Sequence, residues 1–300
     1  MSKSTKKLLQ RAIPISLFIF IFVVYINNLT RDIYSGDIGD LVTAAFVFGV
    51  PHPPGYPLLT MLGAVFSHLP FPITPVTKVA LVSVFSSMLA LLLFFKFSIK
   101  ETKSSFIAIL STSVLAFSYI FWFFSEIPEV FALNNLFIVT LFYFAMQFYE
   151  KRNNKYLYIS SFLVGLSLTN QHQIILIFPS IALLLLPSLK KFTGDWSILF
   201  KSVSLFILGL LPYLYIPIAS SRDPVVNWNN ASNLKNFLHL VLRQDYVTFS
   251  KGNLQFSERL PIFDVYLTSL LNNYSILIVL ICISGIFFLL KKNKLKFASL

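Results

Sequence analysis

Two aspartates three residues apart, Asp37 and Asp40, are the side chains of this sequence best placed to take a proton. They precede an apolar stretch, Leu41–Phe48, that predicts a short helix ending at Gly49. Asp37 stands where the N-cap belongs, and the spacing turns the Asp40 carboxylate back toward Asp37. Either the two acids are a capping pair that the helix dipole favours, or they are a general base and its orienting partner.

A stiff segment with the sequence P-H-P-P-G-Y-P follows and contains His52. Each proline fixes its own φ angle and restricts the residue before it, so His52 is held in a rigid turn. Its imidazole is either an exposed polar side chain of that turn or a ligand of a substrate. No second histidine stands at the spacing of metal ligands, so the sequence does not support a zinc site.

Further polar residues stand where apolar segments begin or end. In S-E-I-P-E-V-F-A-L-N-N-L, Glu129 and Asn134 lie at the start of an apolar helix, where polar groups usually face a cavity or a neighbouring helix. In L-T-N-Q-H-Q, Asn170 and His172 share one turn, which alone indicates only a polar connection between helices. These four residues are candidates either for binding a substrate or for joining helices.

Two arginines, Arg222 and Arg243, stand in the polar segments S-S-R-D-P-V and L-R-Q-D-Y-V-T. Arginine holds a phosphate group through two parallel hydrogen bonds, so both residues are candidates for binding one. The acids Asp223 and Asp245 follow closely in the sequence. The alternative is therefore two local ion pairs at the surface, which contribute little to stability.

The elements that must position these residues are apolar segments too long and too numerous for a soluble domain. The chain has 300 residues, of which 56% are hydrophobic and 12% charged, with a mean hydropathy of +0.75. The apolar residues occur in blocks of roughly 14 to 24, as helices that cross a hydrocarbon layer require. We therefore predict an all-α integral membrane protein, a polytopic helical bundle of about eight spans. The predicted spans are Ile13–Ile26, Val79–Phe95, Phe106–Phe124, Val130–Phe148, Tyr156–Thr169, Ile174–Leu186, Ile198–Ala219 and Ile276–Leu290.

The charges alternate between the two sides of this topology. One side carries 17 cations and three acids, whereas the other carries seven cations and nine acids. The positive-inside rule places the basic side, and with it both termini, in the cytoplasm. The net charge of +12 thus reflects topology, and no nucleic acid is expected as a partner. Tyr156–Thr169 and Ile174–Leu186 are short, so they form either two crossings or a re-entrant hairpin that leaves the topology unchanged.

All the candidate residues then fall on the non-cytoplasmic side. They lie in two long outer loops, residues 27–78 and 220–264, and in two polar turns between spans. Loops of such length in a compact protein are usually functional. We treat residues 1–300 as a single transmembrane domain whose first span is an uncleaved signal anchor and whose first outer loop carries short interfacial helices. Cys282 is the sole cysteine, so no intrachain disulfide can form.

Several motifs, in this order, resemble one family: D-I-G-D-L-V-T-A-A, G-V-P-H-P-P-G-Y-P-L, E-V-F-A-L-N-N-L, L-T-N-Q-H, L-P-Y-L-Y-I-P-I-A-S-S and L-R-Q-D-Y-V-T-F-S. It is the family of GT-C-type membrane glycosyltransferases that includes the animal transmembrane protein O-mannosyltransferase of the endoplasmic reticulum. The resemblance covers most of the chain, from the first outer loop to the last of these motifs. Members of the family are usually longer, which implies a chain that is truncated at its C-terminus or a minimal form.

The resemblance implies a GT-C-like fold and an inverting transfer of a mannose-like sugar from a polyprenyl-phosphate carrier. The acceptor would be a protein hydroxyl or a glycan on the non-cytoplasmic side. The resemblance maps the catalytic acid onto Asp37 and places Asp40 at a second acidic position that often holds Glu. Such a donor contains no nucleotide and needs no glycine-rich phosphate loop, but its departing phosphate needs cations. The candidates for that role are Arg222, Arg243, His52 and His172.

The expected partners are membrane lipid, the lipid-linked sugar donor and the acceptor. No cofactor is expected besides the donor, and the sequence leaves the need for a divalent metal open. The chain would lie in the plasma membrane of a prokaryote or in the endoplasmic reticulum of a eukaryote. The alternatives are a non-catalytic membrane subunit and a transporter or lipid flippase. A transporter would keep charges near the middle of the membrane and often shows a repeated half, whereas here the acids gather on one face.

Overall fold

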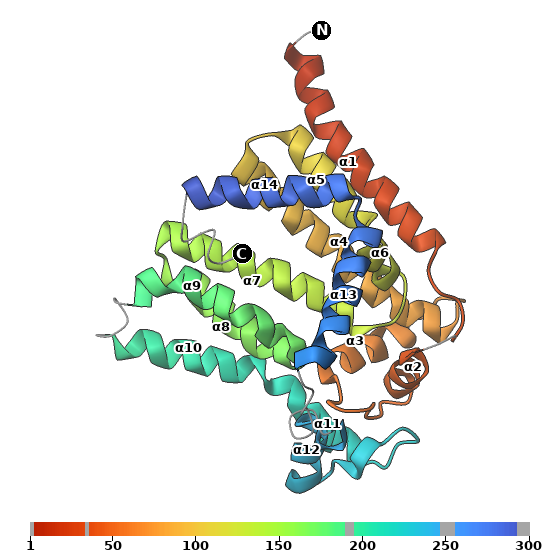
Figure 1. The fold of residues 1–300 in the computed structure, drawn as a ribbon. Coiled ribbons are helices and arrows are strands. Elements are labelled where there is room, and N and C mark those ends of the chain that lie inside the picture. Colours follow the sequence, from red (N-terminus) through yellow and green to blue (C-terminus); the bar gives the residue numbers. More distant parts are fainter. Residues whose placement is uncertain (1–2, 34–35, 190–194, 247–255, 293–300) are drawn as a thin grey trace.

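The computed structural model describes residues 3–33, 36–189, 195–246 and 256–292, and these residues form helices joined by turns (Figure 1). The one strand-like pairing in these ranges is an isolated parallel bridge between Val50 and Asn227. The predicted all-α architecture is therefore confirmed, and the apolar helices support an integral membrane protein.

Every segment predicted to span the membrane coincides with one helix or with consecutive helices. The α-helices are α1 (Lys3–Asn27), α2 (Ile38–Phe46), α3 (Pro57–Ser67), α4 (Pro75–Thr102), α5 (Ser105–Ala116), α6 (Tyr119–Ser125), α7 (Val130–Lys151), α8 (Asn154–Leu168), α9 (Phe178–Leu189), α10 (Trp196–Gly209), α11 (Tyr215–Ser220), α12 (Leu234–Val241), α13 (Phe256–Asn273) and α14 (Ile276–Lys292). The described residues also include the short 3-10 helices η1 (His172–Ile177), η3 (Leu211–Leu214), η4 (Trp228–Asn230) and η5 (Gln244–Tyr246).

Fewer helices are long and apolar enough to cross a membrane than the eight spans that the sequence predicted. Within the described residues, three helices are long and apolar enough to cross a membrane: α4, α7 and the continuous run Trp196–Ser220. The count rises to five if two bent pairs each form one span, α5 with α6 (bent by 69°) and α13 with α14 (bent by 104°). The shortfall arises because apolar segments such as Ala12–Asn27 and His172–Leu185 are shorter than 18 residues.

The helices of the bundle pack closely where small residues face one another. Helices α8 and α10 cross at Gly165 and Gly209, and a Cβ atom on Gly165 would lie only 2.1 Å from the carbonyl oxygen of Phe206. Such small-residue crossings let helix backbones approach in the absence of a hydrophobic driving force. Helix α1 is fixed to α5 by the Tyr25 hydroxyl, which donates to the carbonyl oxygen of Ala116 (2.7 Å).

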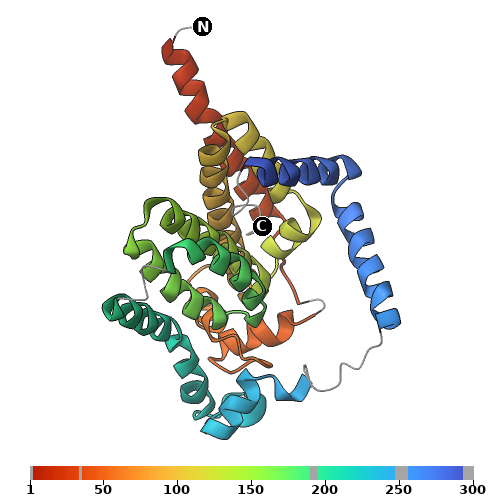
Figure 2. The ribbon, with the colours of Figure 1, turned by 60° about the vertical axis from the view of Figure 1, so that its left-hand side comes forward.

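The short helices gather at one end of this bundle. Figure 1 shows α2, α3, α11 and α12 together at the lower end of the view, where α4 begins. Both predicted outer loops thus fold into short helices at the same end. Figure 2 shows α13 to the right of the other helices, with α14 running from its upper end back toward the upper part of the bundle, away from this cluster of short helices. The end that carries α2, α3, α11 and α12 is where the functional site has to be sought.

Two surface positions test whether this end faces outward. In a Cys282→Ser background, a cysteine at Ser232 should react with an impermeant thiol reagent added to intact cells. A cysteine at Asn153, in the basic turn between α7 and α8, should react only after the membrane is opened. Both positions are exposed, so access within the fold limits neither reaction. The opposite labelling pattern would place the short-helix end in the cytoplasm and contradict the predicted topology.

Candidate functional site

Helix α2 presents its two acids in different ways. Asp37 occupies the N-cap position, as predicted, yet its side chain makes no capping hydrogen bond and is 59% exposed. The predicted end of the helix was wrong: α2 runs from Ile38 to Phe46, and Phe48 rather than Gly49 adopts a left-handed conformation (φ 52°). Gly49 is needed for another reason, because a Cβ atom there would lie 2.3 Å from the carbonyl oxygen of Val226. The Asp37 carboxylate is therefore not used to cap the helix.

His52 lies between the two acids. Its Nδ1 atom is 2.6 Å from Oδ2 of Asp40, and its backbone N–H donates to the same oxygen (2.8 Å). Its Nε2 atom is 3.4 Å from Oδ2 of Asp37. Because an ionised carboxylate can only accept, Nδ1 carries the hydrogen and the Nε2 position faces Asp37. The side chain is 10% exposed, so the alternative of an exposed turn residue was wrong.

The second outer loop closes over this arrangement. Backbone hydrogen bonds join Val50 N–H to the Val226 carbonyl (2.8 Å) and Trp228 N–H to the Val50 carbonyl (3.1 Å). The indole Nε1–H of Trp228 donates to Oδ1 of Asp40 (3.0 Å), and the Tyr215 hydroxyl donates to the Gly49 carbonyl (2.9 Å). These hydrogen bonds join the two outer loops at the acid pair, although Asp40 and Trp228 are 188 residues apart in the sequence.

These bonds set the charge of Asp40. Partial burial opposes ionisation of the carboxyl group, but the hydrogen bonds from His52 and Trp228 outweigh it and lower the pKa of Asp40. Asp40 is therefore a permanent anion near neutral pH that is engaged on both oxygens. Asp37 has one oxygen beside His52 and remains open to solvent. Of the two acids, Asp37 is the one that a substrate can reach.

A third carboxyl group, Glu129, lies beside them. It is the N-cap residue of α7, and its side chain accepts from the N–H of Val130 (3.4 Å). Burial, followed by the nearby charge of Asp37, raises the pKa of Glu129 to about 7, while His52 acts in the opposite direction. The sequence had left Glu129 open between binding and helix contact, and the structure brings it to the acid pair.

Aromatic residues line the space around His52. The ring of Tyr56 lies edge-on to the imidazole with centroids 5.1 Å apart, and the ring of Trp228 lies edge-on at 6.3 Å. Burial raises the pKa of Tyr56, Arg243 lowers it, and Asp37 and Glu129 raise it further. Tyr56 therefore lies within the electrostatic reach of both the acids and Arg243, and it joins the two parts of the site.

Arg243 follows α12 in a left-handed conformation (φ 53°). Its guanidinium group lies over the ring of Tyr246, 5.0 Å from the centroid. Its Nε atom is buried and has no hydrogen-bond partner among the described residues. The predicted alternative of an ion pair with Asp245 was wrong, because Asp245 accepts from His239 (2.7 Å) and Asn229 (2.9 Å) instead. Arg243 is a half-buried cation, and no ion pair joins it to an acid among the described residues.

His172 belongs to the same region. Its Nε2 atom is 2.7 Å from the hydroxyl of Tyr213, and that hydroxyl donates to the Leu168 carbonyl (2.8 Å). Since the hydroxyl hydrogen is already used, His172 must donate through Nε2. Burial and the nearby Arg243 lower the pKa of His172, so its imidazole is neutral near pH 7. A neutral ring that donates to Tyr213 is a poor counter-ion for a phosphate group.

Among the described residues, the remaining predicted residues form no hydrogen bond or ion pair with the acid pair. Asn170 is fully buried and donates to the Val130 carbonyl (3.1 Å), so it ties the 169–172 turn to α7. Asn134 lies one turn further along α7 and is 8% exposed. Arg222 is exposed at the end of α11 without an ion pair to Asp223. The predicted substrate-binding role of these three residues stays a prediction.

Sequence reasoning missed the aromatic part of the site. Trp228 stands in V-N-W-N-N, Tyr56 in P-P-G-Y-P and Tyr213 in L-P-Y-L-Y, and none belongs to a motif with a known chemical role. The sequence offers no local signal for these contacts, because an aromatic residue does not indicate which distant segment buries it. In the described part of the chain, no three His, Cys, Asp or Glu residues are grouped so as to hold a metal ion.

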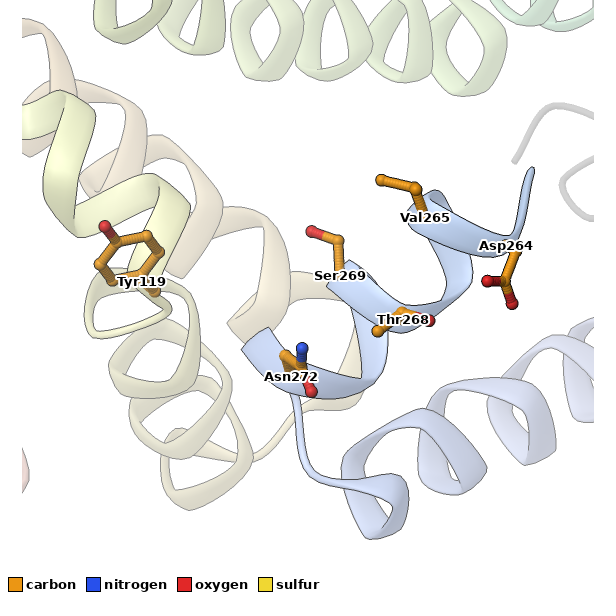
Figure 3. Close-up of a pocket in the computed structure, with 6 residues that line it drawn as sticks. All are labelled: Tyr119, Asp264, Val265, Thr268, Ser269 and Asn272. Carbon is orange, nitrogen blue, oxygen red and sulfur yellow. The ribbon is translucent and has the colours of Figure 1, made fainter. Parts of the chain in front are cut away.

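One cavity lies elsewhere and contains none of the predicted residues. Figure 3 shows it between α13 and Tyr119 at the start of α6; its volume is about 630 Å³, and its other lining residues are Asp264, Val265, Thr268, Ser269 and Asn272. Because α13 stands beside the bundle and is mostly exposed, the cavity is a gap along one helix without converging charges. It does not compete with the acid cluster as a site of chemistry.

A comparison with protein families places this chain in one of them. The family model described as "Protein O-mannosyl-transferase TMEM260 N-terminal domain" matches residues 37–193, a range that includes Asp37, Asp40, His52 and Glu129. No solved structure matches the chain.

Two curated relatives bear the same description. Protein O-mannosyl-transferase TMEM260 of Mus musculus is 36% identical over 244 residues, which are 79% of this chain and 34% of the relative. Protein O-mannosyl-transferase tmem260 of Dictyostelium discoideum is 31% identical over 250 residues, which are 77% of this chain and 30% of the relative. The chain thus spans about a third of the length of the curated relatives that it matches.

The bond from Trp228 to Asp40 gives a stability difference that depends on pH. Trp228→Phe keeps a ring against His52 but removes one donor to the carboxylate, so thermal unfolding at pH 7 should show a loss of about 1 kcal/mol. The pKa of Asp40 is lowered in the fold, so its ionised form stabilises the protein above the ordinary carboxyl pKa near 3.9 and ceases to do so as pH falls through the lower folded value. The difference from wild type should therefore narrow below about pH 4. An equal difference at pH 7 and pH 3.5 would indicate lost packing instead.

Proposed function

Because this chain belongs to the family of protein O-mannosyl-transferase TMEM260, we propose that it transfers mannose from a polyprenyl-phosphate carrier to a hydroxyl group of a protein. The names of the relatives supply the sugar and the protein acceptor. The carrier is what the resemblance to GT-C-type membrane glycosyltransferases implies, and a cluster that combines carboxylates with the arginine Arg243 is compatible with a departing phosphate.

One observation supports this proposal above the others: the solvent-exposed carboxylate of Asp37 lies beside an imidazole that is itself anchored by Asp40. In an inverting transfer, the acceptor oxygen attacks the anomeric carbon while the bond to the phosphate oxygen breaks. A base must take the hydroxyl proton as that bond forms. Asp37 is accessible for this step, whereas both oxygens of Asp40 are engaged by His52 and Trp228.

The departing phosphate carries the negative charge that develops in this reaction, and Arg243 is the residue best suited to hold it. Its guanidinium group lies near Tyr56, which in turn contacts His52, so the charge acts on the same space as the acids. Arg243 lacks an acidic partner among the described residues, and its Nε–H has no acceptor there. His172 is neutral and Arg222 is exposed outside the cluster, so both fit this role less well.

The proposal includes the topology and fold that the sequence suggested. We expect the eight apolar segments to act as crossings or partial crossings of a GT-C-like bundle, with the short-helix end on the non-cytoplasmic face. The carrier's phosphate would then approach from the outer leaflet, at the level of α2 and α12. Its polyprenyl tail would remain between the spans, in hydrocarbon.

Asp37→Asn tests the role of the base. Asparagine matches aspartate in size but cannot take a proton near neutral pH, so transfer of radiolabelled mannose from polyprenyl-phosphate mannose to a serine-containing peptide should fall by roughly 10²-fold or more. Because the Asp37 side chain makes no capping hydrogen bond, both Asp37→Asn and Asp37→Ala should leave thermal stability close to that of wild type.

Asp32→Asn is the matched control, since Asp32 is an exposed carboxylate of the same loop that only accepts from the N–H of Ile33. It should transfer mannose at nearly the wild-type rate. A normal rate of transfer by Asp37→Asn would show that Asp37 is not the base and would contradict the proposed mechanism.

Arg243→Lys tests the phosphate ligand. Lysine keeps the positive charge but not the planar pair of donors, so the rate of transfer should fall by roughly tenfold or more while the protein remains folded. Arg222→Lys changes an exposed arginine by the same chemistry and should have a smaller effect. Equal losses in the two variants, or a normal rate in Arg243→Lys, would contradict the assignment to Arg243.

A further inference from the structure

The placement of His52 goes beyond the role of a substrate ligand that the sequence suggested. The ring is buried, and both nitrogen atoms face carboxylates: Nδ1 faces Asp40 at 2.6 Å and Nε2 faces Asp37 at 3.4 Å. A ring that only braced a turn would need one such partner. With carboxylates on both edges of the imidazole, Asp40 can fix the ring through Nδ1 while Nε2 faces the exposed carboxylate of Asp37 and can exchange a proton with it.

We propose that His52 is a positioning residue that receives, through Nε2, the proton that Asp37 takes from the acceptor hydroxyl. This inference rests on the proposed function and extends it. Asp37 touches the acceptor, His52 acts through Asp37, and Asp40 fixes the ring. The site then works as an acid–imidazole–acid relay rather than as a single carboxylate.

A lone carboxylate is a weak base, and a neighbouring imidazole can compensate for this. An ordinary aspartate binds a proton with a pKa of about 3.9, whereas an ordinary imidazole does so near 6.5. A proton taken by Asp37 is therefore held more firmly once it has moved to a neighbouring imidazole. The resulting imidazolium would lie between the negative charges of Asp37 and Asp40, which favours its formation.

The proton and the electron pairs balance as follows. The acceptor oxygen forms a bond to the anomeric carbon, and the bond from that carbon to the phosphate oxygen breaks with its electron pair going to the phosphate. The hydroxyl proton moves to Asp37 and then to the lone pair on Nε2 of His52. It leaves through Asp37 to water, because the Asp37 side chain is the exposed end of the path. The products are the mannosylated hydroxyl, the polyprenyl phosphate and one proton.

The surroundings of His52 hold the ring in this orientation. The backbone N–H of His52 and the indole of Trp228 both donate to Asp40, so the carboxylate that orients Nδ1 is fixed from two sides. The other titratable groups that face the ring are Glu129 at the start of α7 and Tyr56 in the same loop. Glu129 titrates near pH 7 and therefore has to be separated from His52 in any pH-dependent experiment.

His52→Asn separates a relay from a brace. The asparagine amide can replace Nδ1–H as the donor to Asp40, but it has no nitrogen that takes a proton. The experiment follows mannose transfer from polyprenyl-phosphate mannose to a serine-containing peptide between pH 4 and pH 9, using the full chain in membranes. In wild type, the rate should decline at acid pH as imidazole protonation blocks the relay. In His52→Asn, the rate should be at least about tenfold lower, with little change in either KM, and its acid decline should move to lower pH because no imidazole remains to be protonated.

Two controls make this shift specific. His68→Asn removes an exposed histidine that stacks on Phe46 and Phe48 outside the acid cluster, and it should keep the wild-type pH profile. Glu129→Gln should keep the acid decline near its wild-type position, whatever its rate, if the decline belongs to His52 rather than to Glu129. An acid decline that stays in place in His52→Asn, or that disappears in Glu129→Gln, would overturn the relay.

Chemical rescue provides a readout that a structural role would not give. His52→Gly leaves space for a free imidazole, so added imidazoles should restore transfer, and more basic ones should restore it more effectively. A His52→Gly protein that melts at the wild-type temperature yet gains nothing from imidazole would overturn the proposal. Failure of wild type to mannosylate any peptide would instead refute the proposed function, which distinguishes the two failures.

Discussion

The carboxylate of Asp40 accepts hydrogen bonds from three donors, and the rest of the site depends on this interaction. Two donors belong to His52, twelve residues away, and the third is the indole of Trp228, 188 residues away. A half-buried anion with one partner removed would be costly, so the two outer loops are bound to one another through it. The parallel bridge between Val50 and Asn227 brings the backbones within reach, and Gly49 permits that approach because any side chain there would collide with Val226.

Because Asp40 is fixed in this way, the three carboxyl groups of the site have different environments and can have different roles. Three carboxyl groups, Asp37, Asp40 and Glu129, lie around one imidazole, yet their environments differ. The pKa of Asp40 is lowered because both of its carboxylate oxygens accept hydrogen bonds. Burial and the charge of Asp37 raise the pKa of Glu129 to about 7. Asp37 is left exposed beside Nε2 of His52. Carboxyl groups whose environments differ in this way are characteristic of acid–base sites, because one can stay ionised while another exchanges protons.

Much of the fold could be read from the sequence, because hydrophobic blocks and breaks are local signals. All eight apolar segments are helical, and α2 begins directly after Asp37 as the N-cap pattern indicated. What failed were properties set by distant contacts. Gly49 seemed to end the helix, but it serves the approach of Val226. Asp245 seemed the partner of Arg243 by proximity in sequence, but it pairs with His239 and Asn229, which leaves the arginine available. Trp228 could not be found, since its partner is 188 residues away.

The location of the site follows from what a membrane allows. In hydrocarbon, backbone groups must be satisfied within helices, so turns, short helices and charged side chains are tolerated only at the ends of the bundle or where protein buries them. The described helices follow this rule, since α2, α3, α11 and α12 cluster at one end, beside the N-terminus of α7 that carries Glu129. A lipid-linked donor meets the same restriction, because its charged phosphate stays at the interface while its tail lies in hydrocarbon. Under the proposed function, enzyme and donor would have their polar chemistry at one level of the membrane, and a site fixed by Asp40 at that level would need to bring only the acceptor from the aqueous side.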